Sequence, residues 1–203
     1  MTRPDQLAQL YLVRHGQTTW NKERKLQGAT DIPLDEEGRK QAHNIRKTLG
    51  LERIDRVVSS PLSRAYETAE IIASQYNVGV AIEHGLKERS YGEYEGQLTS
   101  SFDEVRRILA TLPPDLRRVY QHKDEETEAI VLDRLIASLK GIAQSSLGQI
   151  VVAVSHGSAM GMLLRTQFGS GGMKSPHLTN TAFLHIASDG DTLTLKKMHG
   201  VKD

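Results

Sequence analysis

Two histidines lie directly after apolar segments of the chain, and each is followed by glycine. Arg14-His15-Gly16 ends the mostly apolar segment 7–13, and His156-Gly157 follows the apolar segment 149–154. Both segments predict β-strands that stop at the glycine. Open α/β sheets bind ligands at the carboxyl ends of their strands, so both histidines are expected at one site. An arginine and two histidines at this place suit the binding of a phosphoryl group.

The nucleophile predicted from these residues is His15. A neutral imidazole can attack phosphorus and form a phosphohistidine, which divides one difficult transfer into two easier ones. Nearby cations disfavour the imidazolium and keep His15 neutral near physiological pH. The same cations stabilise the charge that spreads over the phosphoryl oxygens in the transition state. Arg14 and Arg64 are the candidates for these cations. His156 would supply a further hydrogen-bond donor if it is protonated beside a dianion.

A leaving alkoxide also needs a proton, and Glu88 is the candidate donor. It follows a strand predicted over 78–82, so it reaches the same edge of the sheet. A carboxyl group at this position could act as general acid and then as the base that activates water.

Apolar periodicity predicts the elements that must position these side chains. Strands are expected over 7–13, 54–59, 78–82, 149–154, 181–187 and 192–197, and helices over 35–49, 60–76, 127–143 and 158–166, with a further helix from 102 that stops at Pro113-Pro114. Asp189-Gly190 predicts a closing hairpin. The alternation indicates an α/β fold, a three-layer α/β/α sandwich whose mostly parallel sheet has an antiparallel edge strand.

The 203 residues suit one domain, 1–203, with a substantial core. The chain contains no repeat, low-complexity tract or linker. Segment 99–126 matches no substrate signature, and we expect it to be a lid or substrate-selecting insertion.

The composition of the chain excludes several classes of binding partner and site. With 26 basic and 25 acidic side chains, the net charge of +1 implies no broad basic field for nucleic acid. The absence of cysteine excludes disulfides, thiolate metal sites and a cysteine nucleophile. No signal peptide is expected, and no window reaches the roughly 18 apolar residues of a membrane helix. We expect a cytoplasmic protein that acts on a small-molecule phosphate ester, without nucleic acid or membrane. Edge strands near 181–197 could pair in a homodimer.

Five segments in order, 12–21, 26–34, 59–69, 86–96 and 154–157, together resemble the histidine phosphatase superfamily, the phosphoglycerate-mutase-like fold. The resemblance implies that His15 is phosphorylated, that Arg14, Arg64 and His156 complete the phosphate pocket, and that Glu88 donates the proton. It further implies that Asn21 and Gln27 line the pocket, with the neighbouring Gly28 and with Gly157, and that no metal or other cofactor is needed. Gln17 stands where many members carry glutamate, a variation that leaves the pocket residues intact.

Several of these residues have structural alternatives. Asn21 could equally cap or turn the backbone, and Gln27-Gly28 could be a turn. A solvated helix face is the favoured interpretation of Arg106, Arg107, Arg117 and Arg118, over an arrangement that reaches over the pocket. We expect Asp124-Glu125-Glu126 to favour the N-terminus of the following helix. The other histidines considered are expected to be structural or solvated: His43 on a helix, His122 in a loop, His185 in a strand and His199 in the tail.

Two activities of the family compete. A mutase must shield its phosphohistidine from water, which requires a large lid and an ordered tail. Here 67 residues separate Glu88 from His156 and 47 follow His156, and the family's mutases are longer in both places. We therefore favour a metal-independent phosphatase. A cofactor-dependent phosphoglycerate mutase is one alternative, and a non-catalytic module that binds a phosphate ester or phosphoprotein is another. The substrate could be a sugar phosphate, a glycolytic acid, a nucleotide-derived ester or a phosphoprotein.

Overall fold

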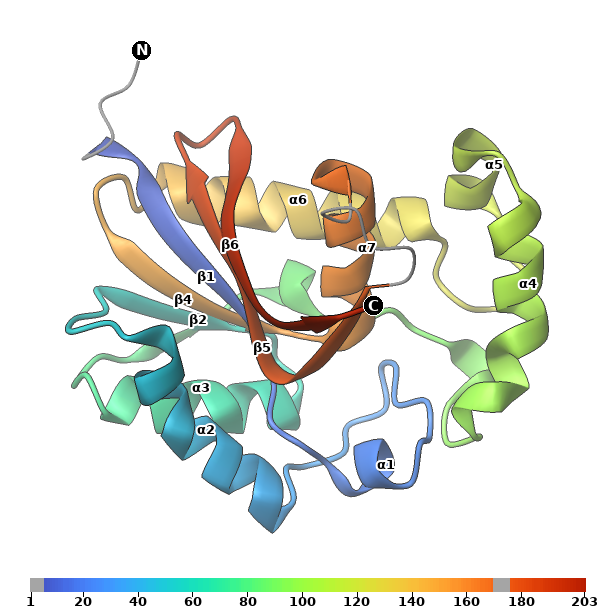
Figure 1. Ribbon diagram of the computed structural model, residues 1–203, viewed down its shortest axis with the longest axis horizontal. Helices are drawn as coiled ribbons and strands as arrows, with labels where there is room; N and C mark the ends of the chain where they lie inside the picture. Colours follow the sequence, from blue (N-terminus) through green and yellow to red (C-terminus); the bar gives the residue numbers. More distant parts are fainter. Residues whose placement is uncertain (1–5, 170–175) are drawn as a thin grey trace.

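A six-stranded sheet forms the centre of the molecule, as the computed structural model shows for residues 6–169 and 176–203 (Figure 1). In the order β3-β2-β4-β1-β5-β6, its strands are β3 (Val80–Ile82), β2 (Arg56–Ser59), β4 (Ile150–Ser155), β1 (Ala8–Arg14), β5 (His177–Ser188) and β6 (Leu193–Lys202). The four strands from β3 to β1 run parallel, whereas β5 is antiparallel to β1 and β6 to β5. The predicted mostly parallel sheet with an antiparallel edge is confirmed.

The register places the carboxyl ends of three parallel strands side by side. Arg14 at the end of β1 pairs with Ser155 at the end of β4, and Ser59 at the end of β2 pairs with Val154. The residues that follow β1 and β4 are His15 and His156. Side chains far apart in the sequence therefore meet at one edge of the sheet, as expected for an open α/β fold.

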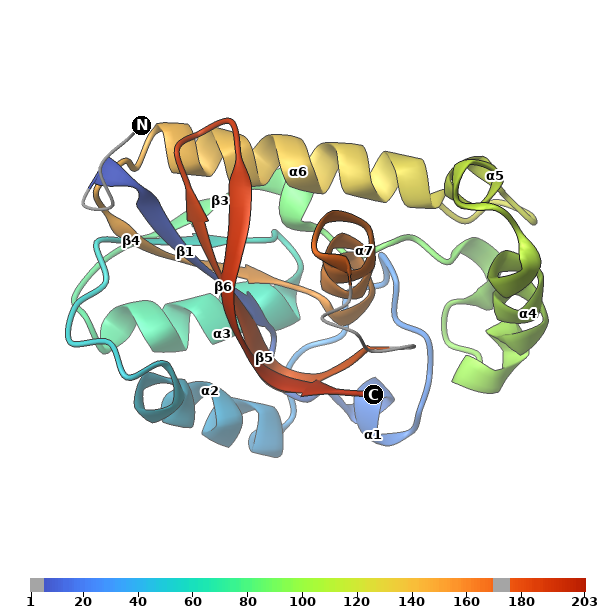
Figure 2. The same cartoon turned by 45° about the horizontal axis from the view of Figure 1, so that its top comes forward.

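Helices cover both faces of the sheet, which confirms the predicted three layers (Figures 1 and 2). α2 (Glu36–Leu49) and α3 (Ser63–Ser74) pack on one face, while α6 (Glu128–Gln144) and α7 (Gly157–Gln167) pack on the other. α2 starts at Asp35, whose carboxylate accepts the Gly38 N–H at 2.7 Å, and it ends at Gly50 with φ 64°. Both ends agree with ordinary helix capping and with the sequence prediction.

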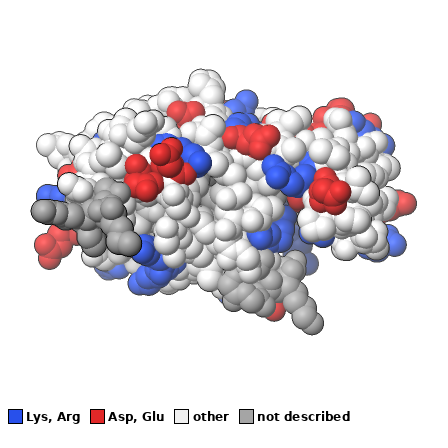
Figure 3. All heavy atoms as spheres, turned by 90° about the horizontal axis from the view of Figure 1, so that it is seen from above, with Lys and Arg blue, Asp and Glu red and all other residues white. Residues whose placement is uncertain are grey.

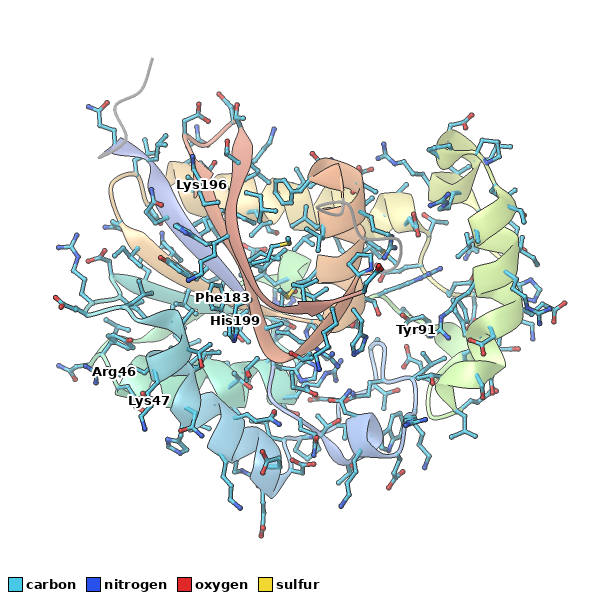
Figure 4. All side chains as sticks on the ribbon, viewed as in Figure 1. Arg46, Lys47, Tyr91, Phe183, Lys196 and His199 are labelled. Carbon is cyan, nitrogen blue, oxygen red and sulfur yellow. The ribbon has the colours of Figure 1, made fainter. Side chains whose placement is uncertain are left out.

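The closing hairpin is longer than predicted. β5 begins at His177, whereas the sequence predicted a start at 181. The prediction missed the first residues because the strand is irregular between Leu178 and Phe183, where Thr181 has φ 59°. A bulge of this kind interrupts the apolar alternation from which a strand is predicted. His199, expected in a tail, lies in β6 and stacks on Phe183 with ring centroids 5.4 Å apart (Figure 4).

The segment between β3 and α6 includes two helices that stand apart from the sheet (Figures 1 and 2). It contains α4 (Asp103–Thr111), α5 (Pro114–Val119) and the short 3₁₀ turns His84–Leu86, Gly92–Tyr94 and Thr99–Phe102; α1 (Thr19–Lys22) precedes it in the chain. The helix predicted from 102 does end before Pro113-Pro114, but Pro114 then begins α5, which the sequence did not indicate. Proline suits the first position of a helix because its missing N–H would be unpaired there anyway.

The carboxylates of the acidic run 124–126 make hydrogen bonds to other parts of the structure. Thr127 caps α6 by accepting the Ile130 N–H. The buried Glu125 carboxylate instead accepts the N–H groups of His122 and Lys123. Glu126 pairs with Arg134 at 2.9 Å. These acids thus bind loop backbone and an arginine of α6, and the favourable effect of their charge on the helix N-terminus stays a prediction.

On the face seen in Figure 3, basic and acidic side chains are interspersed, in keeping with the near-zero net charge. In the described ranges 6–169 and 176–203, no helix has both the length and the apolar character needed to cross a membrane.

Candidate active site

The His15 imidazole is held in a defined orientation at the end of β1. Its Nδ1 lies 2.6 Å from the Gly16 carbonyl oxygen, and its own carbonyl accepts an N–H from the Asn180 side chain at 3.1 Å. A carbonyl can only accept, so Nδ1 carries the proton and Nε2 keeps a free lone pair. The ring thus presents a nucleophilic nitrogen.

The surroundings of His15 favour the neutral imidazole. Burial lowers the pKa of His15 well below its usual value, and the positive charges of Arg64 and Arg14 lower it further. The sequence prediction named the cations, whereas burial is the larger cause. Both effects disfavour the charged ring and preserve the lone pair.

Two arginines, the half-buried Arg14 and the buried Arg64, place positive charge near the ring. The fully buried Arg64 donates from Nη1 to the Thr30 carbonyl and from Nη2 to the Gly28 carbonyl, both at 2.8 Å. Arg14 donates from Nη1 to the Leu178 carbonyl. Burial lowers the pKa of Arg64 to about 10, so the guanidinium remains charged at neutral pH. Backbone carbonyls of a loop and of β5 orient the two cations without neutralising them.

His156 lies beside His15, with ring centroids 5.1 Å apart. Burial, followed by the charges of Arg64 and of other nearby groups, lowers the pKa of His156 well below its usual value. The sequence predicts that His156 donates a hydrogen bond if it is protonated, but its lowered pKa favours the neutral ring. A neutral imidazole still carries one N–H and can donate from it. Its Nε2 lies 2.8 Å from the Ser60 hydroxyl, and when that hydroxyl donates, the proton of the neutral ring is on Nδ1.

Unpaired nitrogens converge on this region. Among the described residues, the buried side-chain atoms without a hydrogen-bond partner include Nε of Arg14, Nε of Arg64 and Nδ1 of His156. Buried polar groups are ordinarily paired, and an unpaired one is costly. Three such nitrogens around one imidazole form an arrangement that a bound oxyanion would satisfy.

The Glu88 side chain contacts the N-terminus of α7. Its carboxylate accepts the N–H of Ser158 at 3.0 Å and the N–H groups of Ala159 and Arg89 at 2.9 Å. These bonds hold both carboxylate oxygens in place beside a helix N-terminus. The carboxylate is thereby placed to accept a proton from water.

These residues line a cleft of about 480 Å³. The predicted residues that line it are Arg14, His15, Asn21, Gln27, Gly28, Arg64, Glu88 and Gly157, while the fully buried His156 lies behind them. Asn21 both lines the cleft and completes the cap of α1 by accepting the Thr18 N–H. The side-chain amide oxygen of Gln27, Oε1, accepts a hydrogen bond from the Thr18 hydroxyl at 3.0 Å.

Gly28 has a structural reason to be glycine. Its φ is 55°, and an added Cβ would collide with the Glu95 carboxylate. That carboxylate accepts the N–H groups of Ala29, Thr30 and Tyr91, at 2.9–3.0 Å, and so joins the loop that holds Arg64 to the loop that follows Glu88. Nothing in the sequence pattern indicated this role of Glu95.

The cleft extends beyond the predicted residues. Its lining also includes Lys25, Arg106, Arg117, Arg165 and His177. Arg106 and Arg117 thus reach the cleft, as in the alternative to a solvated face, although the side chain of Arg106 is also exposed. Arg107 and Arg118 are exposed, and Arg118 pairs with Asp133 on α6. A helical pattern does not reveal which neighbour faces its polar side, so the sequence could not separate the two pairs.

The buried histidines predict a pH-dependent stability. Because their pKa values in the folded protein are depressed, only the unfolded chain takes up these protons as the pH falls below about 6.5. Each histidine should therefore lower the free energy of unfolding by up to about 1.4 kcal/mol per pH unit. In urea unfolding between pH 7.5 and 5.5, His156→Gln should reduce this loss, whereas the exposed His43→Gln should not. Equal slopes for His156→Gln and the wild type would contradict the assignment.

In the part of the chain that the structure describes, no group of three histidine or acidic side chains is arranged to hold a metal ion.

Comparisons with known proteins agree with this geometry. A family model described as the histidine phosphatase superfamily (branch 1) matches residues 10–200. Phosphoglycerate mutase-like protein 4 from Arabidopsis thaliana is 29% identical over 93% of the chain and 84% of its own length. The uncharacterized phosphatase PhoE from Bacillus subtilis (strain 168) is 34% identical over 86% of each chain. The solved structure of YhfR from Bacillus stearothermophilus has a TM-score of 0.78 and 29% identity, covering 93% of this chain and 95% of that one.

Proposed function

The chain belongs to the histidine phosphatase superfamily, and on that basis we propose that it is a phosphatase that hydrolyses phosphomonoesters through a phosphohistidine on His15. The observation that carries the proposal is the set of three unpaired buried nitrogens, on Arg14, Arg64 and His156, around an imidazole whose Nε2 is free. These donors suit the oxygens of a phosphoryl group that Nε2 attacks.

In the first step, His15 Nε2 forms a bond to phosphorus while the bond to the ester oxygen breaks. The guanidinium groups of Arg14 and Arg64 stabilise the negative charge that spreads over the phosphoryl oxygens. The leaving oxygen takes a proton from the Glu88 carboxyl group.

In the second step, the ionised Glu88 acts as a base. A water molecule attacks phosphorus and gives a proton to the carboxylate, while the bond from phosphorus to Nε2 breaks. Inorganic phosphate leaves, and His15 regains its lone pair. The three N–H bonds to Glu88 support this step because they hold the carboxylate oxygens in a fixed position.

The segment between Glu88 and His156 favours hydrolysis over phosphoryl exchange. It contains 67 residues, which leaves little chain there to shield a phosphohistidine. The names of similar proteins include both a phosphatase and a phosphoglycerate mutase-like protein. A mutase is therefore the second candidate.

With 3-phosphoglycerate as substrate, we expect most of the product to be inorganic phosphate. Added 2,3-bisphosphoglycerate should not accelerate interconversion of 2- and 3-phosphoglycerate, because the enzyme need not remain phosphorylated between substrates. Phosphate release and isomer ratio can be followed together by ³¹P NMR. Fast, bisphosphate-dependent interconversion would favour the mutase.

We also propose that residues 99–126 form the substrate-selecting part of a single domain 1–203. Phe102, Arg106, Leu109 and Arg117 from this segment line the cleft. The first and last strands of the described chain belong to the same sheet, which supports one folding unit.

A further inference from the structure

Beyond the phosphoryl-binding end, the cleft has two unlike walls. Leu26, Phe102, Leu109 and Ala110 contribute apolar surface, mainly from the segment of α4. Glu128 at the start of α6 and Arg165 on α7 also line the cleft. Figures 1 and 2 show the start of α6 and the body of α7 between the sheet and α4. A ligand in this space contacts apolar side chains, mainly from the segment of α4, and the ion pair of Glu128 on α6 with Arg165 on α7.

Glu128 is unusual among the lining residues. Its side chain is 7% exposed, and among the described residues its carboxylate has one contact, with Arg165 Nη2 at 3.5 Å. An ionised carboxylate can accept about four hydrogen bonds, and burial with few of them is unfavourable. Glu88, the other acid lining the cleft, accepts three N–H groups. Glu128 therefore retains the capacity to accept donors from a ligand.

The chemistry of this pair restricts the leaving group. A second phosphate or a carboxylate placed against Glu128 would be repelled by it. A hydroxyl group can donate to Glu128 and accept from Arg165, and neighbouring hydroxyls can do so together. The C–H groups of a sugar ring would pack against the apolar wall. The volume of about 480 Å³ exceeds the need of phosphate alone and falls within the range of small-molecule pockets.

We propose that Glu128 and Arg165 form a hydroxyl-binding subsite that selects sugar or polyol phosphates. The inference rests on the proposed phosphatase function and names its substrate class. The competing occupant is an acidic leaving group held by Arg106 and Arg117, the cations that α4 and α5 contribute to the lining. Arg106 already pairs with Asp103 at 2.5 Å, which weakens its hold on an anion.

The test compares two alkyl esters of similar size. Glucose 6-phosphate carries hydroxyl groups, and cyclohexylmethyl phosphate has a ring without them. Glu128→Gln, which keeps the side-chain volume, should lower the ratio of kcat/KM for glucose 6-phosphate to that for cyclohexylmethyl phosphate by about tenfold, the weight of a hydrogen bond to a charged group. Asp133→Asn on the exposed side of α6 is the matched control and should leave this ratio unchanged.

The outcomes separate the subsite from the proposed function. An equal loss on both esters would mean that Glu128 only supports the fold and would overturn the subsite. Preference for 3-phosphoglycerate over the sugar ester, without dependence of the ratio on Glu128, would overturn it in favour of the arginines. If no ester is hydrolysed, the phosphatase proposal fails, and binding of glucose 6-phosphate to His15→Ala then decides the subsite. That affinity should fall about tenfold in the double variant with Glu128→Gln, and unchanged affinity would reject the subsite.

Discussion

His15→Ala should reduce turnover by at least about 10⁴-fold for every phosphomonoester, whatever its leaving group. The reason is that Nε2 of His15 supplies the bond to phosphorus in the first step, and alanine has no atom that can replace it. The variant should also lose the acid-labile phosphate that the wild-type enzyme traps when it is quenched during turnover. Quenched-flow labelling with a ³²P-labelled ester measures both quantities.

The matched control is His43→Ala, which removes an exposed imidazole from α2 and should leave turnover and trapped phosphate unchanged. Phosphate should still bind to His15→Ala, because Arg14 and Arg64 remain. Turnover of His15→Ala near the wild-type rate would refute the covalent mechanism. Loss of phosphate binding together with turnover would instead indicate that the variant is misfolded, which circular dichroism would reveal.

Glu88→Gln should slow hydrolysis of an alkyl ester by roughly 10²–10⁴-fold, the loss typical of a missing general acid. Under single-turnover conditions, formation of the phosphohistidine from nitrophenyl phosphate should slow far less, because nitrophenolate leaves without a proton. Affinity for phosphate should stay the same or rise, since the variant removes a negative charge near the pocket. Rapid-quench measurement of phosphoenzyme formation from both esters gives the comparison.

Glu93→Gln provides the control for this variant. Glu93 is exposed on the same loop and pairs with Lys123. Any effect of Glu93→Gln on the rate of phosphoenzyme formation should therefore be the same for both esters. If Glu88→Gln slowed phosphoenzyme formation equally from both esters, Glu88 would not be the leaving-group acid. His84, which begins the 3₁₀ turn before Glu88, would then be the next candidate.

The central part of the site could be predicted because it depends on local pattern and on one rule of topology. Apolar runs that end in glycine marked β1 and β4, and the carboxyl ends of parallel strands meet at one edge of a sheet. His15 and His156 therefore had to be neighbours. Arg64 and Glu88 follow further parallel strands and were placed by the same reasoning.

The remaining contributions depend on packing that no local pattern records. Asn180 reaches the His15 carbonyl from an irregular part of β5, and its neighbour Thr181 has a positive φ. Glu128 sits in the first turn of a helix, where an acid is ordinary and predicts nothing about a cleft. Arg106 and Arg117 have a helical pattern typical of solvated residues. In each case the decisive partner is distant in sequence.

The pairing of β1 bears on how the protein is made. β1 is synthesised first, but its sheet neighbours are β4 and β5, with Gln9 opposite Ile150 and Val13 opposite Phe183. During translation, this apolar strand has no sheet partner until more than two thirds of the chain has been synthesised. Contacts of such sequence separation form slowly and leave strand edges open to aggregation. We therefore expect His15, which follows β1, to be among the last parts of the newborn chain to reach its native surroundings.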